Sequence, residues 1–466
     1  MTFPTLAANH VGIHQGSPEY THVHEAVEEV LCLANGGTGN VLDRLISPGD
    51  TVLLKPNLIR ESHAQKPDEW QQVITHGAVI EAVLIQVLQR LRGKGKVIIA
   101  DGPQTDSDFD EICRRLGLHQ MVSKYSKSGV EVQLLDLRRD RWYQRDDVIY
   151  KREKLPGDPA GYTRVNLAQA STFNDYALNG QLYGADYDME ETRRFHSEGK
   201  HEYILCRTPL DADVVINLPK MKTHKKTGVT FSLKNLVGIN GYRNCLPHHT
   251  VGMPDEGGDE FRNGSVSNKV QSQAVVAFKR FLVNGGGTGN GVARMMKRVG
   301  KIVFGDTNEV VRSGNWHGND TAWRMVLDLN KALFYYNGEG KLRTKPLRYL
   351  ALVDGIIAGE GNGPMAPDAK PAGLLVAGLN PLAVDTVCAQ LMGFDYRRIP
   401  LLARGWNMRE LPLVSFAADE ISCVSNISSW QGSFTEVQHA QHLSFEAHFG
   451  WKNHIECEHG CLAEVA

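Results

Sequence analysis

The sequence predicts an α/β protein with a doubly wound, mainly parallel sheet that carries antiparallel and irregular insertions. Short apolar runs alternate with amphipathic segments of helical length through the first third of the chain. The links between them are short, and several apolar runs end directly at a lysine or an aspartate. This alternation is typical of strand–helix–strand units with right-handed crossovers, so we expect parallel strands covered by helices on both faces.

The regular part of this pattern lies before residue 138. One strand runs into Lys55-Pro-Asn57, and the next ends at Asp101. The helix between them has an apolar face at helical spacing, with Thr75 as its expected N-cap. In chain order, we expect strands at Val11–His14, Thr51–Leu54, Lys96–Ala100 and Val130–Leu137, and helices at His24–Ala34, Thr75–Arg92 and Phe109–Leu116.

The remaining chain predicts a continuation of this core with two insertions. Residues 138–201 are polar and rich in Tyr, Arg and Asp, which favours an antiparallel excursion, and 241–345 form the second insertion. We assign residues 1–405 to the core and 406–466 to an irregular C-terminal region. Further strands are expected at Asp213–Leu218, Leu350–Val353 and Leu374–Ala377, and helices at Gln271–Val283, Val292–Val299, Asp320–Tyr336 and Pro381–Met392.

Composition narrows the function classes. The 466 residues contain 51 Lys and Arg against 53 Asp and Glu, which argues against a general nucleic-acid or membrane-surface binder. The N-terminus lacks the pattern of a signal peptide, and no apolar stretch approaches the roughly 20 residues needed to span a bilayer. The eight cysteines are scattered, as expected of buried thiols in a cytosolic protein. We therefore expect a cytoplasmic location.

The segment Asp213–Gly241 carries the strongest functional signal. It begins as an apolar strand and then presents lysines, one histidine and an asparagine, interleaved with Gly, Thr and Ser. Open α/β sheets bind anionic ligands where strands release such groups at their carboxyl ends. A solvated basic loop is the alternative, and the uncharged residues between the lysines argue against it.

These observations predict one mixed site at the carboxyl edge of the sheet. Ammonium groups at Lys55, Lys222 and Lys234 suit a phosphate or carboxylate. The imidazole of His224 suits proton transfer near neutral pH, although a structural histidine is an equal alternative. Catalytic roles are expected for His224, Lys222, Asp354 and Glu360. The carboxylates of Asp101, Asp354, Glu360 and Asp385 suit a divalent cation such as magnesium.

The tail offers a second, separate metal hypothesis. His454, Cys457, His459 and Cys461 place four nitrogen and sulfur donors within eight residues, which are ligands that zinc accepts. Their spacing is not that of a standard zinc finger, and chain ends are often disordered.

Several motifs resemble one known family. VLLKPNLI, ADGP, INLPKMKTHKKTGVTFSLKNLVGI, VDGIIAGEGNGP and LAVDTVCAQLMGFD occur in the order seen in proteins grouped as domain of unknown function 362, over roughly residues 48–405. The resemblance implies site positions at Lys55, Asn57, Asp101, Lys222, His224, Lys234, Asn235, Asp354, Glu360 and Asp385, with Asn57 and Asn235 beside the substrate-binding lysines. Many relatives carry a ferredoxin-like module with C-x₂-C-x₂-C spacing, and this chain has no such iron–sulfur motif.

The leading hypothesis is an enzyme acting on an anionic small molecule, phosphorylated or carboxylated, with or without a bound divalent metal. One alternative is a redox protein that works beside a separate iron–sulfur partner. Another is a racemase-like proton-transfer enzyme, because the order His224, Gly228, Lys234, His248 resembles the core of nickel-pincer lactate racemases. A third is a non-catalytic ligand-binding protein. The sequence leaves the cofactor and the oligomeric state open.

Overall fold

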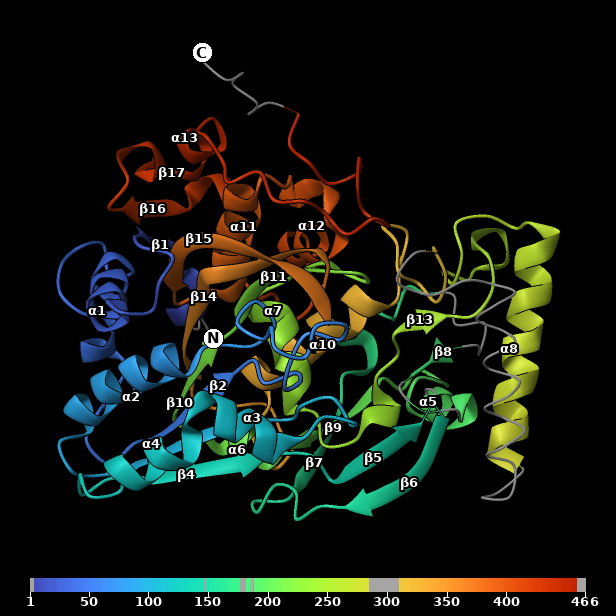
Figure 1. Cartoon of the computed structure of the whole chain (residues 1–466), viewed down its shortest axis with the longest axis horizontal. Helices are drawn as coiled ribbons and strands as arrows, with labels where there is room; N and C mark the ends of the chain where they lie inside the picture. The colour runs from blue at the N-terminus through green and yellow to red at the C-terminus, as the bar shows by residue number, and fades with distance from the viewer. Residues whose placement is uncertain are drawn as a thin grey trace.

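The computed structural model describes residues 4–145, 148–176, 182–184, 186, 188–284 and 310–458. An 11-stranded sheet forms its centre (Figure 1). Within this sheet a run of five neighbouring strands is parallel. In spatial order these are β14 (Arg348–Asn362), β10 (Val214–Leu218), β2 (Thr51–Pro56), β3 (Lys96–Asp101) and β4 (Glu131–Asp136).

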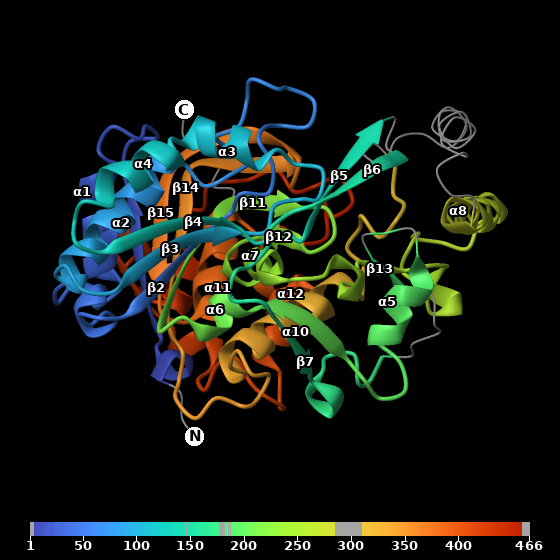
Figure 2. The same ribbon diagram turned by 90° about the horizontal axis from the view of Figure 1, so that it is seen from below.

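Helices cover both faces of the parallel strands. Along β2 the apolar side chains divide between the faces, because Val52 and Leu54 join one hydrophobic core and Leu53 joins the other. Figure 2 shows the two helical layers on opposite sides of the sheet. The first layer contains α1 (Val23–Leu33), α2 (Gly77–Leu91), α3 (Phe109–Leu116) and α4 (Leu118–Tyr125), and the second contains α10 (Ala322–Tyr335), α11 (Pro381–Met392) and α12 (Pro400–Trp406). The predicted doubly wound α/β fold is therefore confirmed.

A long antiparallel hairpin departs from the predicted pattern. The strand expected to end at Asp354 continues as β14 to Asn362 and pairs with β15 (Ala366–Gly378). Asp354 thus lies within a strand, and the glycine-rich run that includes Glu360 is mostly strand as well. The glycines have a packing role here, since a Cβ on Gly359 would lie 3.0 Å from the Cβ of Lys222.

The lysine-rich segment after Pro219 also differs from the expected loop. Residues Lys220–His224 form a fully buried strand, β11, which pairs parallel with β14 and antiparallel with β12 (Gly228–Thr230). Pairing with the glycine-rich part of β14 satisfies the backbone groups of β11. The lysines are consequently held on a rigid element under the surface.

The C-terminal region belongs to the same sheet. Strand β1 (His10–Gln15) pairs antiparallel with β15 and parallel with β16 (Ser422–Ser425), and β17 (Gly432–Ser433) extends this edge. Figure 1 shows these C-terminal elements beside β1. The expectation of an irregular region from residue 406 was thus incomplete, because its strands are too short to give a clear periodic pattern.

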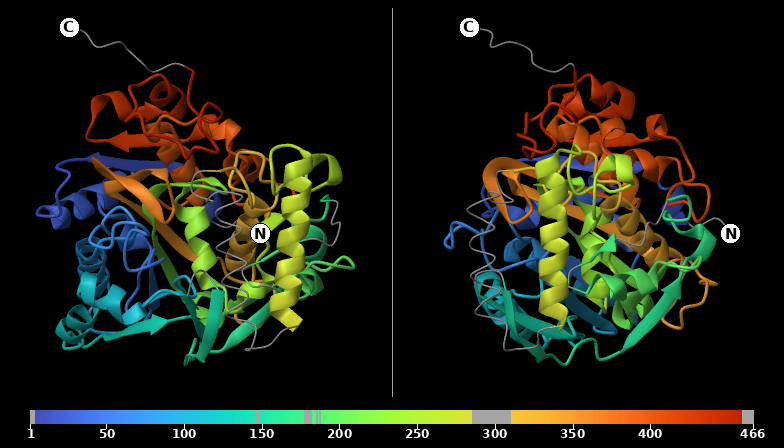
Figure 3. Two further views of the ribbon diagram at one scale, coloured as in Figure 1. Left: turned by 45° about the vertical axis from the view of Figure 1, so that its right-hand side comes forward. Right: turned by 90° about the vertical axis from the view of Figure 1, so that its right-hand side faces the viewer.

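The two insertions have different characters. In the first, β5 (Asp140–Arg145) and β6 (Val148–Lys154) form an antiparallel pair, as expected. In the second, α8 (Val266–Asn284) runs along the side of the molecule opposite α1 (Figures 1 and 3). Helix α10 is buried along its whole length and is part of the core. The predicted helix Val292–Val299 lies outside the described residues. No helix in the described ranges is long and apolar enough to cross a bilayer.

Candidate functional site

A buried ion pair occupies the carboxyl ends of β2 and β3. Lys55 Nζ lies 2.6 Å from Asp101 Oδ1, and both side chains are buried. The backbone N–H groups of Leu58 and Gly102 also donate to the Asp101 carboxylate, at 2.7 and 2.8 Å. Burial lowers the pKa of Lys55, although the adjacent Asp101 opposes this shift. The predicted meeting of Lys55 and Asp101 is therefore present in the structure.

Gly238 brings a second segment directly onto this pair. A Cβ at that position would lie 1.9 Å from Asp101 Oδ1 and 2.9 Å from Lys55 Nζ. The carbonyl of Gly238 accepts a hydrogen bond from the N–H of Gly102 at 2.9 Å. Only a residue without a side chain permits this approach. The loop that follows the lysine-rich segment is thereby fixed to the carboxyl edge of the sheet.

Strand β11 places Lys220, Lys222 and His224 at alternate positions on one face. Lys220 Nζ lies 2.8 Å from Asp354 Oδ2 and also donates to the carbonyl of Ile357 at 3.0 Å. Lys222 has no carboxylate partner in the described residues; its Nζ donates to the carbonyl of Val73. Burial, followed by the charges of Lys220 and Lys234, holds the pKa of Lys222 well below its usual range.

The short helix α7 (Ser232–Asn235) holds Lys234 beside these groups. The Asp385 carboxylate accepts from the N–H groups of Ser232 and Leu233 at 2.8 and 2.9 Å. At the other end, Asn235 Nδ2 donates to the side chain of Asn217 at 2.7 Å and to the carbonyl of Lys55 at 3.2 Å. Asp385 and Asn235 therefore anchor the helix. Burial raises the pKa of Asp385 to about 7.

The Lys234 side chain makes no hydrogen bond or ion pair within the described part of the chain. It is partly exposed, whereas Lys55, Lys220 and Lys222 are fully buried. Burial and the charges of Arg243 and Lys55 lower its pKa to about 8. Its own charge in turn contributes to the lowered pKa of Lys222 and of His224, so these groups lie within electrostatic reach of one another.

Two histidines near Lys234 have opposite tautomers. His224 Nδ1 accepts from the N–H groups of Lys226 and Thr227 at 3.0 and 3.2 Å, so the neutral ring carries its proton on Nε2. His248 Nδ1 donates to the carbonyl of Leu246 at 2.9 Å, which leaves a lone pair on Nε2. Burial keeps the pKa of His224 well below its usual value and lowers that of His248 to about 3.

This arrangement changes the role expected for His224. Protonating its Nδ1 would break both backbone hydrogen bonds, because that nitrogen already serves as their acceptor. The ring suits a hydrogen-bond donor to an anion better than an acid–base group. His248 is the histidine whose free Nε2 can accept a proton.

Arg243 is a component that the sequence analysis missed. Its guanidinium donates to the carbonyls of Gly102, at 3.0 Å, and Pro103. Burial first, and then the nearby charge of Arg138, lowers the pKa of Arg243 to about 10. The turn-rich sequence around Arg243 gave no periodic signal. Its position soon after the lysine-rich segment was the available indication.

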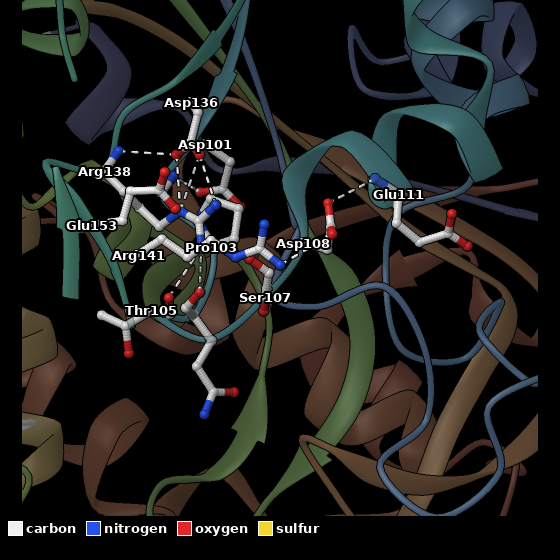
Figure 4. Close-up of polar contacts among 12 residues, drawn as sticks. Asp101, Pro103, Thr105, Ser107, Asp108, Glu111, Asp136, Arg138, Arg141 and Glu153 are labelled. Atoms are coloured by element: carbon white, nitrogen blue, oxygen red, sulfur yellow. Dashed lines mark hydrogen bonds and ion pairs between the residues drawn. The ribbon is translucent and has the colours of Figure 1, made fainter. Parts of the chain in front are cut away.

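Arg138 fixes the loop that accepts these bonds. It forms a bidentate contact with Asp136 and donates to the carbonyls of Gln104 and Ser107 at 2.8 and 2.9 Å. Figure 4 shows Arg138 beside Asp136, close to Asp101 and to the loop that carries Pro103 and Ser107. The carboxyl ends of β3 and β4 are therefore joined through one arginine, which keeps the edge of the site rigid.

We call the resulting group the cation cluster. It comprises Lys55, Lys220, Lys222, Lys234 and Arg243. Asp101 and Asp354 each pair with one of its lysines. Among the described residues, no carboxylate forms an ion pair with Lys222, Lys234 or Arg243. The cluster therefore carries excess positive charge in a largely buried place.

The structure does not bring the predicted metal-binding carboxylates together. Asp101 and Asp354 bind separate lysines, and Asp385 caps α7. Glu360 contacts the N–H of Glu446 at 2.9 Å and Lys370 at 3.3 Å, away from these groups. In the ranges that the structure describes, no three His, Cys, Asp or Glu side chains are grouped as a metal site. The structure thus does not group the four carboxylates of the expected divalent-cation site, because each of them contacts a different partner. Metal binding stays a prediction.

Three further predicted positions make local contacts. Asn57 Oδ1 accepts from the N–H of Ile59 at 3.3 Å and closes the turn after β2. In the tail, the ring of His454 stacks on His317 with centroids 3.5 Å apart, and Cys457 Sγ lies 3.9 Å from the side chain of Gln390. His459 and Cys461 lie outside the described residues, so the zinc hypothesis stays a prediction.

Two cavities lie away from the cation cluster. One, of about 700 Å³, lies between α5 (Met189–Phe195) and α8, and another, of about 850 Å³, lies beside α12. Volume alone is a weaker indicator of a ligand than uncompensated charge, because buried cations without partners are costly unless a ligand neutralises them. We therefore take the cation cluster as the candidate site.

The chain is similar to proteins of known sequence and structure. A crystal structure of a Thermotoga maritima protein aligns with 76% of this chain and 55% of its own, at 11% identity and a TM-score of 0.34, so this chain spans about half of that one. A protein of Synechocystis described as thylakoid-associated is 24% identical over 368 residues, which are 79% of this chain and 70% of the relative. Residues 52–162 and 156–390 match the family described as domain of unknown function (DUF362), and the chain therefore belongs to that family.

Proposed function

We propose that the cation cluster binds a small phosphorylated or carboxylated molecule and that the protein is an enzyme acting on it. The observation that carries this proposal is the excess of buried positive charge around Lys222, Lys234 and Arg243, which have no carboxylate partner in the described residues. Burying a cation is costly unless an opposite charge compensates it. An anionic ligand supplies that charge.

The accessible side of the cluster gives the ligand its contacts. Lys234, Arg243 and His248 are partly exposed, whereas Lys222 is fully buried. Lys234 and Arg243 hold the anion from the exposed side, and the Nε2–H of His224 donates a further hydrogen bond. These donors are fixed on β11 and on anchored loops. They can therefore bind an anion without first rearranging.

Proton transfer is the second function that a specific observation favours. His248 presents a free lone pair at Nε2 near Lys234, while His224 presents an N–H. A base and a donor that flank one anion are the groups needed to move a proton next to a carboxylate or phosphate. The racemase-like alternative therefore stays open as a proposal, with His248 as the base.

Location and partners stay predictions. The Synechocystis relative is described as thylakoid-associated, and this chain shows no bilayer-spanning helix in its described ranges. An iron–sulfur partner also stays a hypothesis, without a specific contact surface to support it.

Thermal stabilisation by anions tests the proposal. We expect pyrophosphate, sugar phosphates or dicarboxylates to raise the melting temperature of the wild-type chain, and Lys234→Met to remove most of this response. The matched control is Lys127→Met, which removes an exposed lysine and should leave the response intact. Equal responses in both variants, or none of these anions stabilising the wild-type chain, would show that the cluster is not a ligand site.

A further inference from the structure

We infer that Lys234 is an amine nucleophile that forms an imine with a carbonyl-bearing anion, an oxo acid or a phosphorylated aldehyde or ketone. This inference rests on the proposed function, because the neighbouring cations must hold the anionic part of the ligand. It adds a covalent step and a substrate class to simple anion binding. Lys234 differs from the other lysines of the cluster in contacts, exposure and surroundings.

The contacts of the other lysines exclude them from this role. Lys55 and Lys220 are fully buried and form ion pairs of 2.6 and 2.8 Å with Asp101 and Asp354. Lys222 is fully buried and donates to a backbone carbonyl. A fully buried amine engaged in these ways has no access to a ligand. Lys234 makes no such contact within the described chain and keeps part of its surface exposed.

The surroundings of Lys234 favour the reactive, neutral form of its amine. Arg243 and Lys55 are the charged groups that lower its pKa, and both are cations. A lysine placed in a desolvated site beside another cation loses its proton more readily than one in water, which is a recognised way to activate an amine. Its anchored helix also fixes the position from which it attacks, since Asp385 and Asn235 hold both ends of α7.

The two histidines supply the proton transfers of imine formation. The Lys234 nitrogen attacks the carbonyl carbon, a carbon–nitrogen bond forms, and the carbonyl π electrons move to oxygen, which the Nε2–H of His224 stabilises. His248 Nε2 takes a proton from the nitrogen and passes it to the oxygen, which becomes the hydroxyl of a carbinolamine. It then takes the second proton from the nitrogen and passes it to this hydroxyl, which leaves as water while the nitrogen forms its double bond to carbon. One carbonyl and one amine thus give one imine and one water, with no other reactant.

Reductive trapping tests this step on the full chain. Pyridoxal 5′-phosphate is a suitable probe, because it combines an aldehyde with a phosphate. After treatment with limiting probe and borohydride, we expect peptide mapping to find the label mainly at Lys234. Labelling should rise as the pH passes about 8, because the Lys234 amine loses its proton there and becomes reactive. Pyridoxal without its phosphate should label Lys234 about tenfold less, because it lacks the charge that the cluster binds.

The conservative variant Lys234→Arg separates this inference from anion binding. It keeps the positive charge but carries no amine that can form an imine. We expect pyrophosphate still to stabilise it, while labelling at position 234 disappears; Lys127→Met should label like the wild-type chain. Pyrophosphate stabilisation of the wild-type chain with label spread over surface lysines would overturn the imine and leave the proposed function standing. Absence of both would overturn both.

Discussion

The cation cluster contains two kinds of buried lysine, and their contrast separates structure from function. Lys220 and Asp354 form a complete contact: both are fully buried, they lie 2.8 Å apart, and Asp354 also accepts from the hydroxyl of Tyr20 and the N–H of His76. Lys222 and Lys234 have no carboxylate partner in the described chain. We interpret the ion-paired lysine as part of the folded core and the lysines without a carboxylate partner as groups that an anionic ligand neutralises.

Breaking the Lys220–Asp354 ion pair should cause the largest loss of stability. Asp354→Asn leaves the Lys220 ammonium buried without its counter-charge, so we expect the free energy of unfolding to fall by about 3–5 kcal/mol. Urea denaturation measures the change. The matched control, Asp368→Asn, alters a carboxylate that is 67% exposed and should cost less than about 0.5 kcal/mol.

A double variant sharpens this result. Replacing both partners, as Lys220→Met with Asp354→Leu, removes the uncompensated charge and should recover most of the lost stability. A loss from Asp354→Asn no larger than that of the exposed control would mean that the pair contributes nothing to the fold. The division between paired and unpaired lysines would then have no energetic basis.

Removing an unpaired lysine should instead raise the free energy of unfolding. Lys234→Met removes a charge that the native state does not neutralise. Because the pKa of Lys234 falls from 10.5 to about 8, we expect the variant to gain stability at pH 7 by about 1–3 kcal/mol, with the lower part of that range allowing for its partial exposure. Urea denaturation of the two proteins at pH 7 measures this difference.

The pH dependence gives the same prediction a second readout. Between pH 8 and 10.5 the unfolded chain holds a proton on Lys234 that the native chain has released. The contribution of Lys234 to wild-type stability therefore rises with pH across that window, and the advantage of Lys234→Met shrinks there. Lys127→Met should show no such convergence. A variant less stable than the wild-type chain at pH 7 would reveal a hidden partner for this lysine.

The sequence predicted the fold well where local patterns decide it. The strand carrying Lys55 and the helix at Asp320–Tyr336 follow from apolar periodicity, and both are present in the structure. The hairpin of β14 and β15 was not predicted, because its glycines resemble a loop until their packing against β11 is seen. Non-local pairing decides such segments, and local propensity does not report it.

The candidate site was predicted in its cations and not in its carboxylates. Lys222 and Lys234 were identified because uncharged residues separate them, and the structure places them within electrostatic reach. The grouping of Asp354 with Glu360 failed, since the sequence cannot show that β14 carries Asp354 into the core and Glu360 out toward Lys370. The tautomers of His224 and His248 depend on backbone contacts that only three-dimensional structure supplies.

Glu360 offers the smallest expected effect and a direct test of this division. Its carboxylate is 19% exposed and lies 3.3 Å from Lys370, which is 29% exposed. Water screens such a pair, so Glu360→Gln should lower the free energy of unfolding by less than about 1 kcal/mol. Lys370→Met, which removes the other partner, should behave similarly. Both variants should keep the full thermal response to pyrophosphate, because neither residue contacts the cation cluster. If Glu360→Gln alone abolished that response while remaining folded, Glu360 would belong to the binding site as its sequence context suggested, and the carboxylate side of the site would have to be rebuilt around it.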